Sequence, residues 1–562
     1  MTEALGTAFD EPLGVGVEEP EDRNGAFPRL GPEQRARLRM AGTLRAVQAG
    51  EVLFREGDAG YDFFLVESGA VTIVQGLGHE NRVIAVHGAH RFLGEINLLT
   101  GSPPYLSAVV RDSGEVVQIS AERLRELVSR DEELSNIILR AFLARREILI
   151  DIGAGVKLVG SRYSRCTHRL REFLVRNRMP FQWMDLEDDD EADALLRALG
   201  ISAADTPVII SGEGVRRNPS NAEVARLLGF GSRGAAPPMC DLVIVGAGPA
   251  GLAAGLYGAS EGLDTQVIDK IAFGGQASTS ARIENYLGFP TGISGSELAE
   301  RATLQARRLG ARMVVPAMAV GLTADNGHYA VELADGSAIN GRTLIVATGA
   351  QYRKLDLPEL DRYEGVGVYY AATQAEAHMC AGDPVLIVGG GNSAGQAAMF
   401  LSQRAASCRL MIRGGDLGKS MSRYLIDELE NRPQVELMTY TEVVELKGKP
   451  SLEAVVVADN RTGERRELEC KTLFVFIGAD PHTGWLRGHV AMDQHCFLLT
   501  GRELEGEDLD LYEDRRPLFL ETSRPGIFAV GDVHSGSVKR VASAVGEGSM
   551  AVRLVHQRLA SR

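Results

Sequence analysis

Hydrophobic patterning changes twice along the chain and divides it into three expected modules. Residues 27–150 alternate short apolar strands with glycine turns, as in an antiparallel β-barrel, and apolar residues at helical spacing predict a closing helix over 134–150. Residues 155–230 predict a strand, a helix and two further strands before a final helix. From 240 onward, runs typical of buried strands precede glycine-rich turns and helices, as in Rossmann-like α/β dinucleotide-binding domains. We expect 1–26 to be a disordered tail and 231–239 to be a linker.

Two glycine-rich turns in the third module indicate dinucleotide binding. The first follows the predicted strand 241–245 and contains Gly246, Gly248 and Gly251 in the spacing G-x-G-x-x-G. Such glycines permit a tight turn and let backbone N–H groups approach a pyrophosphate at a helix N-terminus. Asp269 ends the next strand about 20 residues further on, where an acid binds a ribose hydroxyl pair. The second turn lies between the predicted strand 384–388 and the predicted helix 395–401, and it contains Gly389, Gly391 and Ala394.

Further motifs give the chain from 241 to its C-terminus a close resemblance to the low-molecular-weight thioredoxin reductases. These motifs are Gly274-Gly275-Gln276, Ile283-Glu284-Asn285, Ala347-Thr348-Gly349 and the run from Gly526 to Gly531-Asp532. The resemblance implies an FAD-binding domain made of 240–365 and 485–562, with an NAD(P)H-binding domain, 366–484, inserted between its halves. It implies that Gly275, Gln276 and Asn285 lie along the flavin and that Gly531 and Asp532 lie at its ribityl chain. We also expect a homodimer.

The expected electron donor follows from the basic residues after the second turn. Reductases specific for NADPH carry a basic cluster there for the 2′-phosphate, and of that cluster only Arg413 is present here, with Lys419 and Arg423 near it in sequence. An arginine suits a phosphate because its planar fork donates parallel hydrogen bonds. We therefore expect NADPH, with NADH as the alternative.

The redox dithiol of the resembled reductases is missing from this chain. Within 367–376, Ala371 and Gln374 stand where those enzymes have their two cysteines, so no residue is assigned as catalytic. Disulfide reduction needs one thiolate to attack and a second sulfur to resolve the mixed disulfide. We predict an FAD-dependent NAD(P)H oxidoreductase with a non-disulfide acceptor: a quinone, a free flavin, an iron–sulfur protein or oxygen. Two alternatives stay open, a thioredoxin-disulfide reductase that uses other cysteines and a redox-sensing scaffold read through the N-terminal module.

The first module resembles cyclic-nucleotide-binding domains. Gly94 and Glu95 begin the expected phosphate cassette, in which the glutamate binds the ribose, but Tyr105 or Leu106 stands where the family has an arginine. A cyclic phosphate is bound best by a bidentate cation. A barrel kept for dimerisation or interdomain packing is therefore favoured over cyclic-nucleotide sensing, with Arg111 as a substitute cation if the ligand does bind.

The second module resembles the glutaredoxin and thioredoxin fold. The resemblance aligns Ser164-Arg165-Cys166-Thr167 with the family's dithiol and makes Pro207, after Thr206, a cis proline. One cysteine at an interior position of that tetrapeptide does not form a redox pair. We expect a spacer or docking element without redox chemistry.

Charge and cysteine spacing exclude several function classes. The net charge of −15 argues against nucleic-acid coating and against binding to anionic membranes. No apolar run approaches the about 18 residues of a membrane span, and the acidic N-terminus lacks the pattern of a signal peptide, so a cytoplasmic protein is expected. Six cysteines without a C-x-x-C pair offer no metal site and no local redox couple.

Overall fold

The computed structural model describes residues 13–560, with gaps at 59, 78–80, 162–163, 212–213, 230–238, 280–282, 284–285, 326, 365–366, 371, 373–376, 378–379, 450 and 513–514. The chain divides into two compact units. The first comprises Met1–Pro237, Ile268–Ala272 and Leu304–Met318. The second comprises Pro238–Val267, Phe273–Thr303 and Ala319–Arg562.

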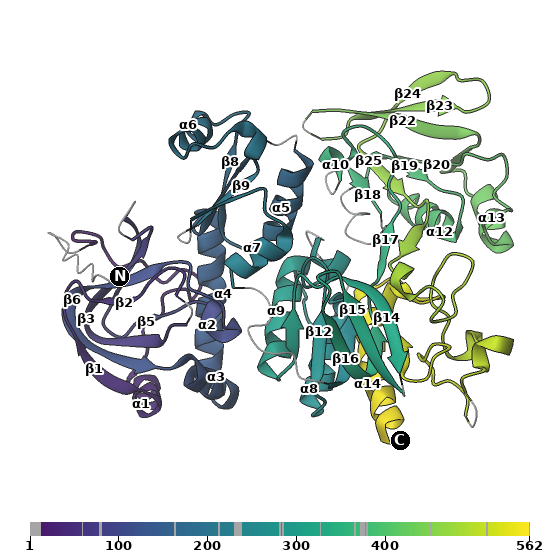
Figure 1. Ribbon diagram of the computed structural model, residues 1–562. Coiled ribbons are helices and arrows are strands. Elements are labelled where there is room, and N and C mark those ends of the chain that lie inside the picture. Colours follow the sequence, from purple (N-terminus) through teal and green to yellow (C-terminus); the bar gives the residue numbers. More distant parts are fainter. Residues whose placement is uncertain are drawn as a thin grey trace. The chain divides into compact units, whose positions relative to one another are not determined.

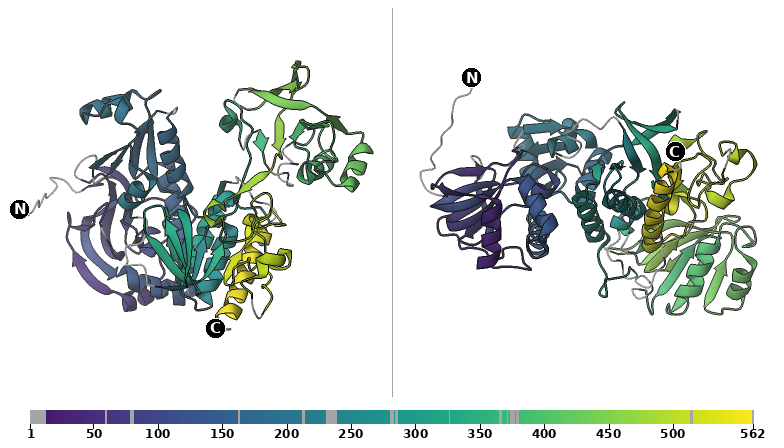
Figure 2. Two further views of the ribbon diagram at one scale, coloured as in Figure 1. Left: turned by 45° about the vertical axis from the view of Figure 1, so that its right-hand side comes forward. Right: turned by 90° about the horizontal axis from the view of Figure 1, so that it is seen from below.

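The N-terminal part of the first unit is an antiparallel barrel, drawn in purple in Figures 1 and 2. Its strands follow the order β1-β6-β3-β4, with β2 added to β6 and β5 added to β3. They are β1 (Thr43–Val47), β2 (Val52–Phe54), β3 (Phe63–Gln75), β4 (Arg82–Gly88), β5 (Phe92–Leu93) and β6 (Ser107–Ile119). The helices are α1 (Pro32–Ala41), α2 (Asn97–Thr100), α3 (Ala121–Arg130) and α4 (Glu132–Asp151). The closing helix predicted over 134–150 is thus α4, which begins two residues earlier because Asp131 caps it through the Leu134 N–H, at 3.0 Å.

Residues 13–26, which we expected within a disordered tail, lie instead against the barrel. Their backbone carbonyls accept hydrogen bonds from its side chains: Leu13 O from Thr72 Oγ1 at 2.7 Å, Pro20 O from Arg91 at 2.8 Å and Ala26 O from Arg145 at 2.8 Å. The acceptors are backbone atoms, so the residue types of this segment give no sign of the contact. The earlier part of the expected tail, 1–12, lies outside the described residues.

The second module adds a four-stranded sheet to the first unit, in the order β10-β9-β7-β8. Strands β7 (Val156–Gly160) and β8 (Phe181–Asp185) are parallel, whereas β9 (Val208–Ser211) runs antiparallel to β7 and to β10 (Gly214–Arg217). The helices are α5 (Arg165–Arg176), α6 (Asp190–Ala198) and α7 (Asn221–Leu227). The Thr206–Pro207 bond before β9 is cis, as the thioredoxin-like resemblance implies.

The first sheet of the second unit carries the first glycine turn. Parallel strands β11, β16 and β27 are joined to an antiparallel pair, β15 and β14, and β12 borders β11. The elements are β11 (Cys240–Val245), α8 (Pro249–Ser260), β12 (Thr265–Ile268), β14 (Ala319–Asp325), β15 (His328–Leu333), β16 (Ala338–Val346), β27 (Ile527–Ala529) and α14 (Val541–Ala560). Between them along the chain lie α9 (Gly295–Arg308) and β13 (Arg312–Val314).

A second, wholly parallel sheet carries the second glycine turn, in the order β18-β25-β19-β20-β21. Its elements are β18 (Val368–Tyr369), β19 (Pro384–Val388), α12 (Asn392–Leu401), β20 (Ser407–Met411), α13 (Arg423–Glu430), β21 (Val435–Met438) and β25 (Thr472–Val475). Val385 and Ile387 of β19 pack in one core with α12 and α13. Leu386 and Val388 pack in another core with β22 (Thr441–Lys447) and β23 (Ala454–Asp459), which pair with β24 (Arg465–Glu469). Both faces are therefore buried, as parallel sheets require.

Two short strands accompany the parallel sheet. β17 (Ala350–Tyr352) and β26 (Ala479–Pro481) pair antiparallel, with Ala350 opposite Pro481. The Arg353–Asp480 ion pair, at 2.6 Å, lies beside this ladder. Along the chain β17 lies between β16 and β18, and β26 lies between β25 and β27, so the two segments that connect the sheets of this unit run side by side.

Candidate functional site

The first glycine turn combines tight packing with one open position. Gly246, between β11 and α8, has φ +103°, and a side chain there would collide with the carbonyl of Ala347. A side chain at Gly251 would collide with the carbonyl of Gly246. At Gly248, by contrast, an added Cβ would meet only the Gly275 Cα, at 3.8 Å. The turn therefore leaves open space at the glycine where a pyrophosphate approaches the backbone.

The segment after Phe273 lies directly on this turn. The Gly274 N–H donates to the carbonyl of Ala247 at 2.7 Å. Gly275, at φ +57°, approaches Gly248 so closely that an added Cβ would be 2.8 Å from its Cα. Gln276 follows in the short 3₁₀ helix Gly275–Thr279. Gly275 and Gln276 thus lie beside the first turn, whereas Asn285 lies outside the described residues.

The Gly531–Asp532 motif reaches the same turn from the C-terminal part of the chain. An added Cβ at Gly531 would be 3.1 Å from the Cβ of Ala250 in α8. The Glu547 carboxylate on α14 holds the motif, because its Oε2 accepts from the Gly531 N–H at 2.6 Å and lies 3.1 Å from His534 Nε2. Burial raises the pKa of Asp532, and burial with the nearby Asp532 carboxylate raises the pKa of Tyr352 to about 12. A half-buried carboxylate beside a glycine turn is suited to accept hydrogen bonds from ligand hydroxyls.

Asp269 is described within the first unit and has a local role there. Its Oδ1 accepts from the N–H groups of Ile271, at 2.9 Å, and Ala272, at 3.2 Å. A carboxylate that bonds backbone groups two and three residues ahead fixes the turn after a strand. Its expected role at a ribose stays a prediction.

The second glycine turn repeats the arrangement of the first. Gly389, at φ +143°, leaves no room for a side chain because the carbonyl of Phe476 faces it. At Gly391 an added Cβ would meet only Ser420 O, at 3.8 Å. Ala394 in the first turn of α12 is fully buried, so it serves close helix–strand packing. Gly391 therefore leaves open space at the second turn, as Gly248 does at the first.

The loop after β20 closes beside this turn and presents basic side chains. Ser420 Oγ donates to Gly390 O at 2.9 Å, and the Ser422 N–H donates to Asn392 Oδ1 at 2.7 Å. Arg413 and Lys419, on the same loop, are exposed. The described part of the chain contains no hydrogen bond or ion pair of the Arg413 side chain, so its guanidinium is available to a phosphate.

The cysteines form no disulfide. All six lie among the described residues, and none of them is joined to another in a disulfide. Burial raises the pKa of Cys408 and of Cys470 to about 12, and Cys240 and Cys380 are buried as well. Cys166 and Cys496 are partly exposed. Positions 371 and 374 lie outside the described residues.

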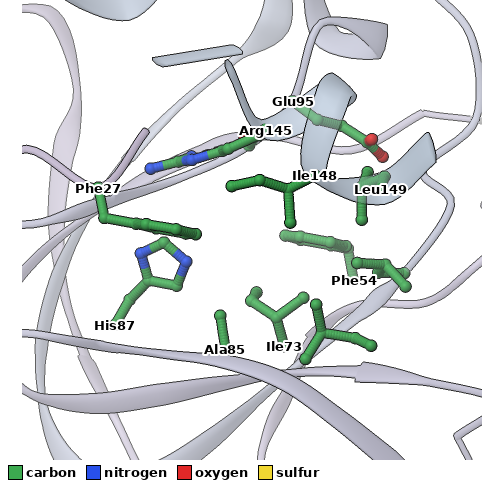
Figure 3. Close-up of a pocket in the computed structure, with 12 residues that line it drawn as sticks. Phe27, Phe54, Ile73, Ala85, His87, Glu95, Arg145, Ile148 and Leu149 are labelled. Carbon is green, nitrogen blue, oxygen red and sulfur yellow. Dashed lines mark hydrogen bonds between the residues drawn. The ribbon is translucent and has the colours of Figure 1, made fainter. Parts of the chain in front are cut away.

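The expected cassette of the barrel lines a cavity. Gly94, Glu95 and Leu106 border it, and the Tyr105 N–H donates to Glu95 Oε1 at 2.8 Å. Arg111 pairs with Asp112 at 2.8 Å and donates to the carbonyls of Gly14 and Val17. The cavity instead contains Arg145 of α4 (Figure 3), which sequence reasoning missed because the closing helix carries no motif that marks an inward arginine.

Comparisons with known proteins identify the class. A model of the pyridine nucleotide-disulphide oxidoreductase family matches residues 240–548, more than half of the chain, and a cyclic nucleotide-binding domain model matches 44–131. The chain therefore belongs to the pyridine nucleotide-disulphide oxidoreductase family, and it joins that domain to an N-terminal cyclic nucleotide-binding domain.

Within this family the chain is similar to thioredoxin reductases. It is 33% identical over 312 residues to the thioredoxin reductase of Treponema pallidum, which covers 55% of this chain and 94% of the relative. It is 29% identical over 317 residues, 56% of this chain and 96% of the relative, to a 34.2 kDa protein in a rubredoxin operon of Clostridium pasteurianum. The structure of thioredoxin reductase from Streptococcus pyogenes matches with 29% identity and a TM-score of 0.50, over 58% of this chain and 99% of that one.

Two features are absent from the described residues. Within them, no helix is both long and apolar enough to cross a membrane. The same residues contain no cluster of three or more His, Cys, Asp or Glu side chains able to hold a metal ion.

Proposed function

We propose that this chain is an FAD-dependent NAD(P)H oxidoreductase that passes electrons to an acceptor other than a disulfide. One observation carries the proposal: both dinucleotide turns keep an open glycine, at 248 and at 391, while the dithiol positions hold Ala371 and Gln374. The chain keeps two glycine turns that are suited to dinucleotides, and it lacks the cysteine pair at the position where thioredoxin reductases carry it.

The residues of the second unit suit the two nucleotides. The backbone N–H groups at the start of α8 would hold the FAD pyrophosphate, with Gly275 and Gln276 beside it and Asp532 accepting from ribityl hydroxyls. The start of α12 would hold the pyrophosphate of NADPH, and Arg413 its 2′-phosphate. The bound flavin would supply the redox chemistry, accepting hydride from the nicotinamide and passing electrons onward. Glu547 positions the Gly531–Asp532 motif through its hydrogen bond to the Gly531 N–H.

The cysteines of this unit are poorly suited to replace the missing dithiol. A thiol attacks as its thiolate, and at pH 7 a pKa of about 12 leaves roughly one in 10⁵ of the molecules ionised. This applies to Cys408 and Cys470. Cys240 and Cys380 are buried, and Cys496 has no second cysteine joined to it. The acceptor we propose is therefore a quinone, a free flavin, an iron–sulfur protein or oxygen.

The proposal is tested by separating the two half-reactions. Anaerobic NADPH should bleach the flavin absorbance of the purified protein, and NADH should do so with a higher KM. Steady-state NADPH oxidation should then be supported by menadione, FMN, rubredoxin or oxygen. Rubredoxin is included because one relative is named for its place in a rubredoxin operon.

An assay of thioredoxin reduction, read with a disulfide reporter, tests the alternative that the chain is a disulfide reductase. The unaltered chain should give no thioredoxin reduction, and the double substitution Ala371→Cys with Gln374→Cys is the matched variant for restoring a relay. Substantial reduction of thioredoxin by the unaltered chain would overturn the proposal and favour a disulfide reductase that uses other cysteines. Sedimentation analysis tests the expected homodimer separately.

A further inference from the structure

His534 directly follows the short 3₁₀ helix Gly531–Val533, which contains the aspartate of the second flavin motif. The residue is 9% exposed. Its neighbours on both sides are bonded to Leu498: the Leu498 N–H donates to Val533 O at 3.1 Å, and Leu498 O accepts from the Ser535 N–H at 2.9 Å. The backbone around His534 is therefore held in place, and its imidazole has defined partners.

Both nitrogens of this imidazole face oxygen acceptors. Nδ1 lies 2.6 Å from the backbone carbonyl oxygen of Ser535, and Nε2 lies 3.1 Å from Oε2 of the Glu547 carboxylate. A neutral imidazole carries one N–H, so it would direct a lone pair at one of these two oxygens. The imidazolium carries two N–H groups and donates to both. The contacts therefore fit the charged form of His534.

The charged groups around His534 favour the same form. Burial opposes the charge, but the hydrogen bond to Glu547 and its negative charge, the bond to the backbone carbonyl and the nearby Glu503 carboxylate outweigh burial. Together they raise the pKa of His534 above its usual 6.5. Asp532, two residues earlier, is close enough to interact with this charge, and Lys539 is a second cation beside Asp532.

The Glu547 carboxylate connects His534 to the turn that presents Asp532. The same Oε2 that faces His534 accepts from the Gly531 N–H at 2.6 Å. Gly531 in turn lies against Ala250 of α8, next to the first glycine turn. A neutral His534 with its Nε2 lone pair toward Oε2 would repel the carboxylate and weaken its hold on Gly531. The charged form keeps this turn in place.

We propose that His534, as an imidazolium, is a positioning residue of the flavin site and makes FAD binding depend on pH. The inference rests on the proposed function, because it takes Asp532 as the acceptor for the ribityl hydroxyls. The charge fixes Glu547 beside Gly531, and it offsets nearby carboxylates at a site that has to accept an anionic dinucleotide. FAD should therefore bind most tightly while His534 is protonated.

FAD titrations of the full-length apoprotein between pH 6 and pH 9 test this inference. The Kd for FAD should be about tenfold higher at pH 9, as expected when about one hydrogen bond at the motif is weakened. Binding and protonation are reciprocal. A tenfold change in Kd therefore requires the pKa of His534 to be about one unit higher with FAD bound than without it. NMR of labelled histidine rings measures both values, and the His534 signal is the one that is missing from His534→Arg.

Three variants separate the charge of His534 from its bulk. His534→Arg keeps a cation throughout this pH range, so it should keep the low Kd and lose the pH dependence. His534→Gln is neutral and should show the higher Kd at both pH values. The matched control is His495→Gln, which replaces an exposed histidine and should keep the pH dependence of the unaltered chain.

The outcomes distinguish this inference from the proposed function. FAD binding with one Kd from pH 6 to pH 9, or a pH dependence that survives in His534→Arg, would overturn the role of His534 and leave the proposed function standing. Equal pKa values of His534 with and without FAD would contradict it in the same way. Absence of FAD binding at every pH would overturn both. The titrations of the unaltered chain decide the pH dependence even if a variant does not fold.

Discussion

At Gly248, a substitution should weaken FAD binding without preventing the first glycine turn from folding. Its backbone, with φ −69° and ψ −175°, is one that any residue adopts, and an added Cβ would meet only the Gly275 Cα at 3.8 Å. Gly248→Ala should therefore change the free energy of unfolding by about 1 kcal/mol or less, the scale of an N-cap change. Gly251→Ala is the contrasting variant. Its methyl group would collide with Gly246 O, and such overpacking costs about 1–3 kcal/mol.

The effect of Gly248→Ala on FAD binding should be much larger. The new methyl group would occupy the space through which the pyrophosphate reaches the backbone of the turn. Losing one hydrogen bond to a charged group costs about 1.5–3 kcal/mol. The Kd for FAD should therefore rise about ten- to hundredfold.

The assay is an FAD titration of apoprotein followed by quenching of flavin fluorescence, together with chemical unfolding of the same samples. Gly546→Ala on α14 is the control, because this exposed helical glycine has no neighbour within 4 Å of an added Cβ. It should keep the Kd for FAD and raise stability by about 0.5–1 kcal/mol. An unchanged Kd in a well-folded Gly248→Ala protein would refute the placement of the pyrophosphate.

Further predictions concern one residue each. Arg413→Ala should raise the KM for NADPH about tenfold by removing a charge-assisted pair, and an equal rise in the KM for NADH would contradict its role. Asp532→Ala should lower the flavin content of the purified protein, read from its absorbance, since the ribityl chain loses an acceptor. Burial raises the pKa of Glu95 from 4.5 to about 7, so the folded barrel holds this proton more tightly than the unfolded chain. Its contribution to stability is present below pH 4.5 and is lost, by up to about 3 kcal/mol, as pH rises through 7. Glu95→Gln should flatten this loss, measured by hydrogen exchange of β3 and β6 amides at pH 5 and pH 8, and an unchanged slope would contradict it.

The glycine turns could be predicted from sequence because their requirements are local. Positive φ at Gly246 and Gly389 and open space at Gly248 and Gly391 all arise within a few residues of a strand end. The comparisons confirm the family that these turns and the later motifs indicated. The roles of the individual residues in binding stay predictions, including that of Asp269, whose Oδ1 is used in its own turn.

The barrel cavity could not be predicted in the same way, because its polar groups come from distant parts of the chain. Glu95 lies in the recognisable cassette, whereas His87 lies on β4 and Arg145 on α4. Neither has a fixed spacing to the cassette. Arg145 donates to backbone carbonyls, including that of Ala26 in the expected tail. Every residue has a backbone carbonyl, so the residue types do not reveal these contacts.

The position of Arg145 also explains why a retained fold does not imply a retained ligand. In the resembled domains a cassette arginine would face the phosphate, but here Tyr105 and Leu106 occupy that stretch. The Tyr105 OH lies 3.1 Å from Met179 Sδ and 3.1 Å from Arg146 Nη2. The cassette side chain thus packs toward the second module, while the buried Arg145 bonds three carbonyls of the barrel itself. A buried cation needs such partners whether or not a ligand is present. Both changes stabilise the barrel without an anion, so cyclic AMP would have to break existing bonds to gain new ones, and its binding should be weak or undetectable.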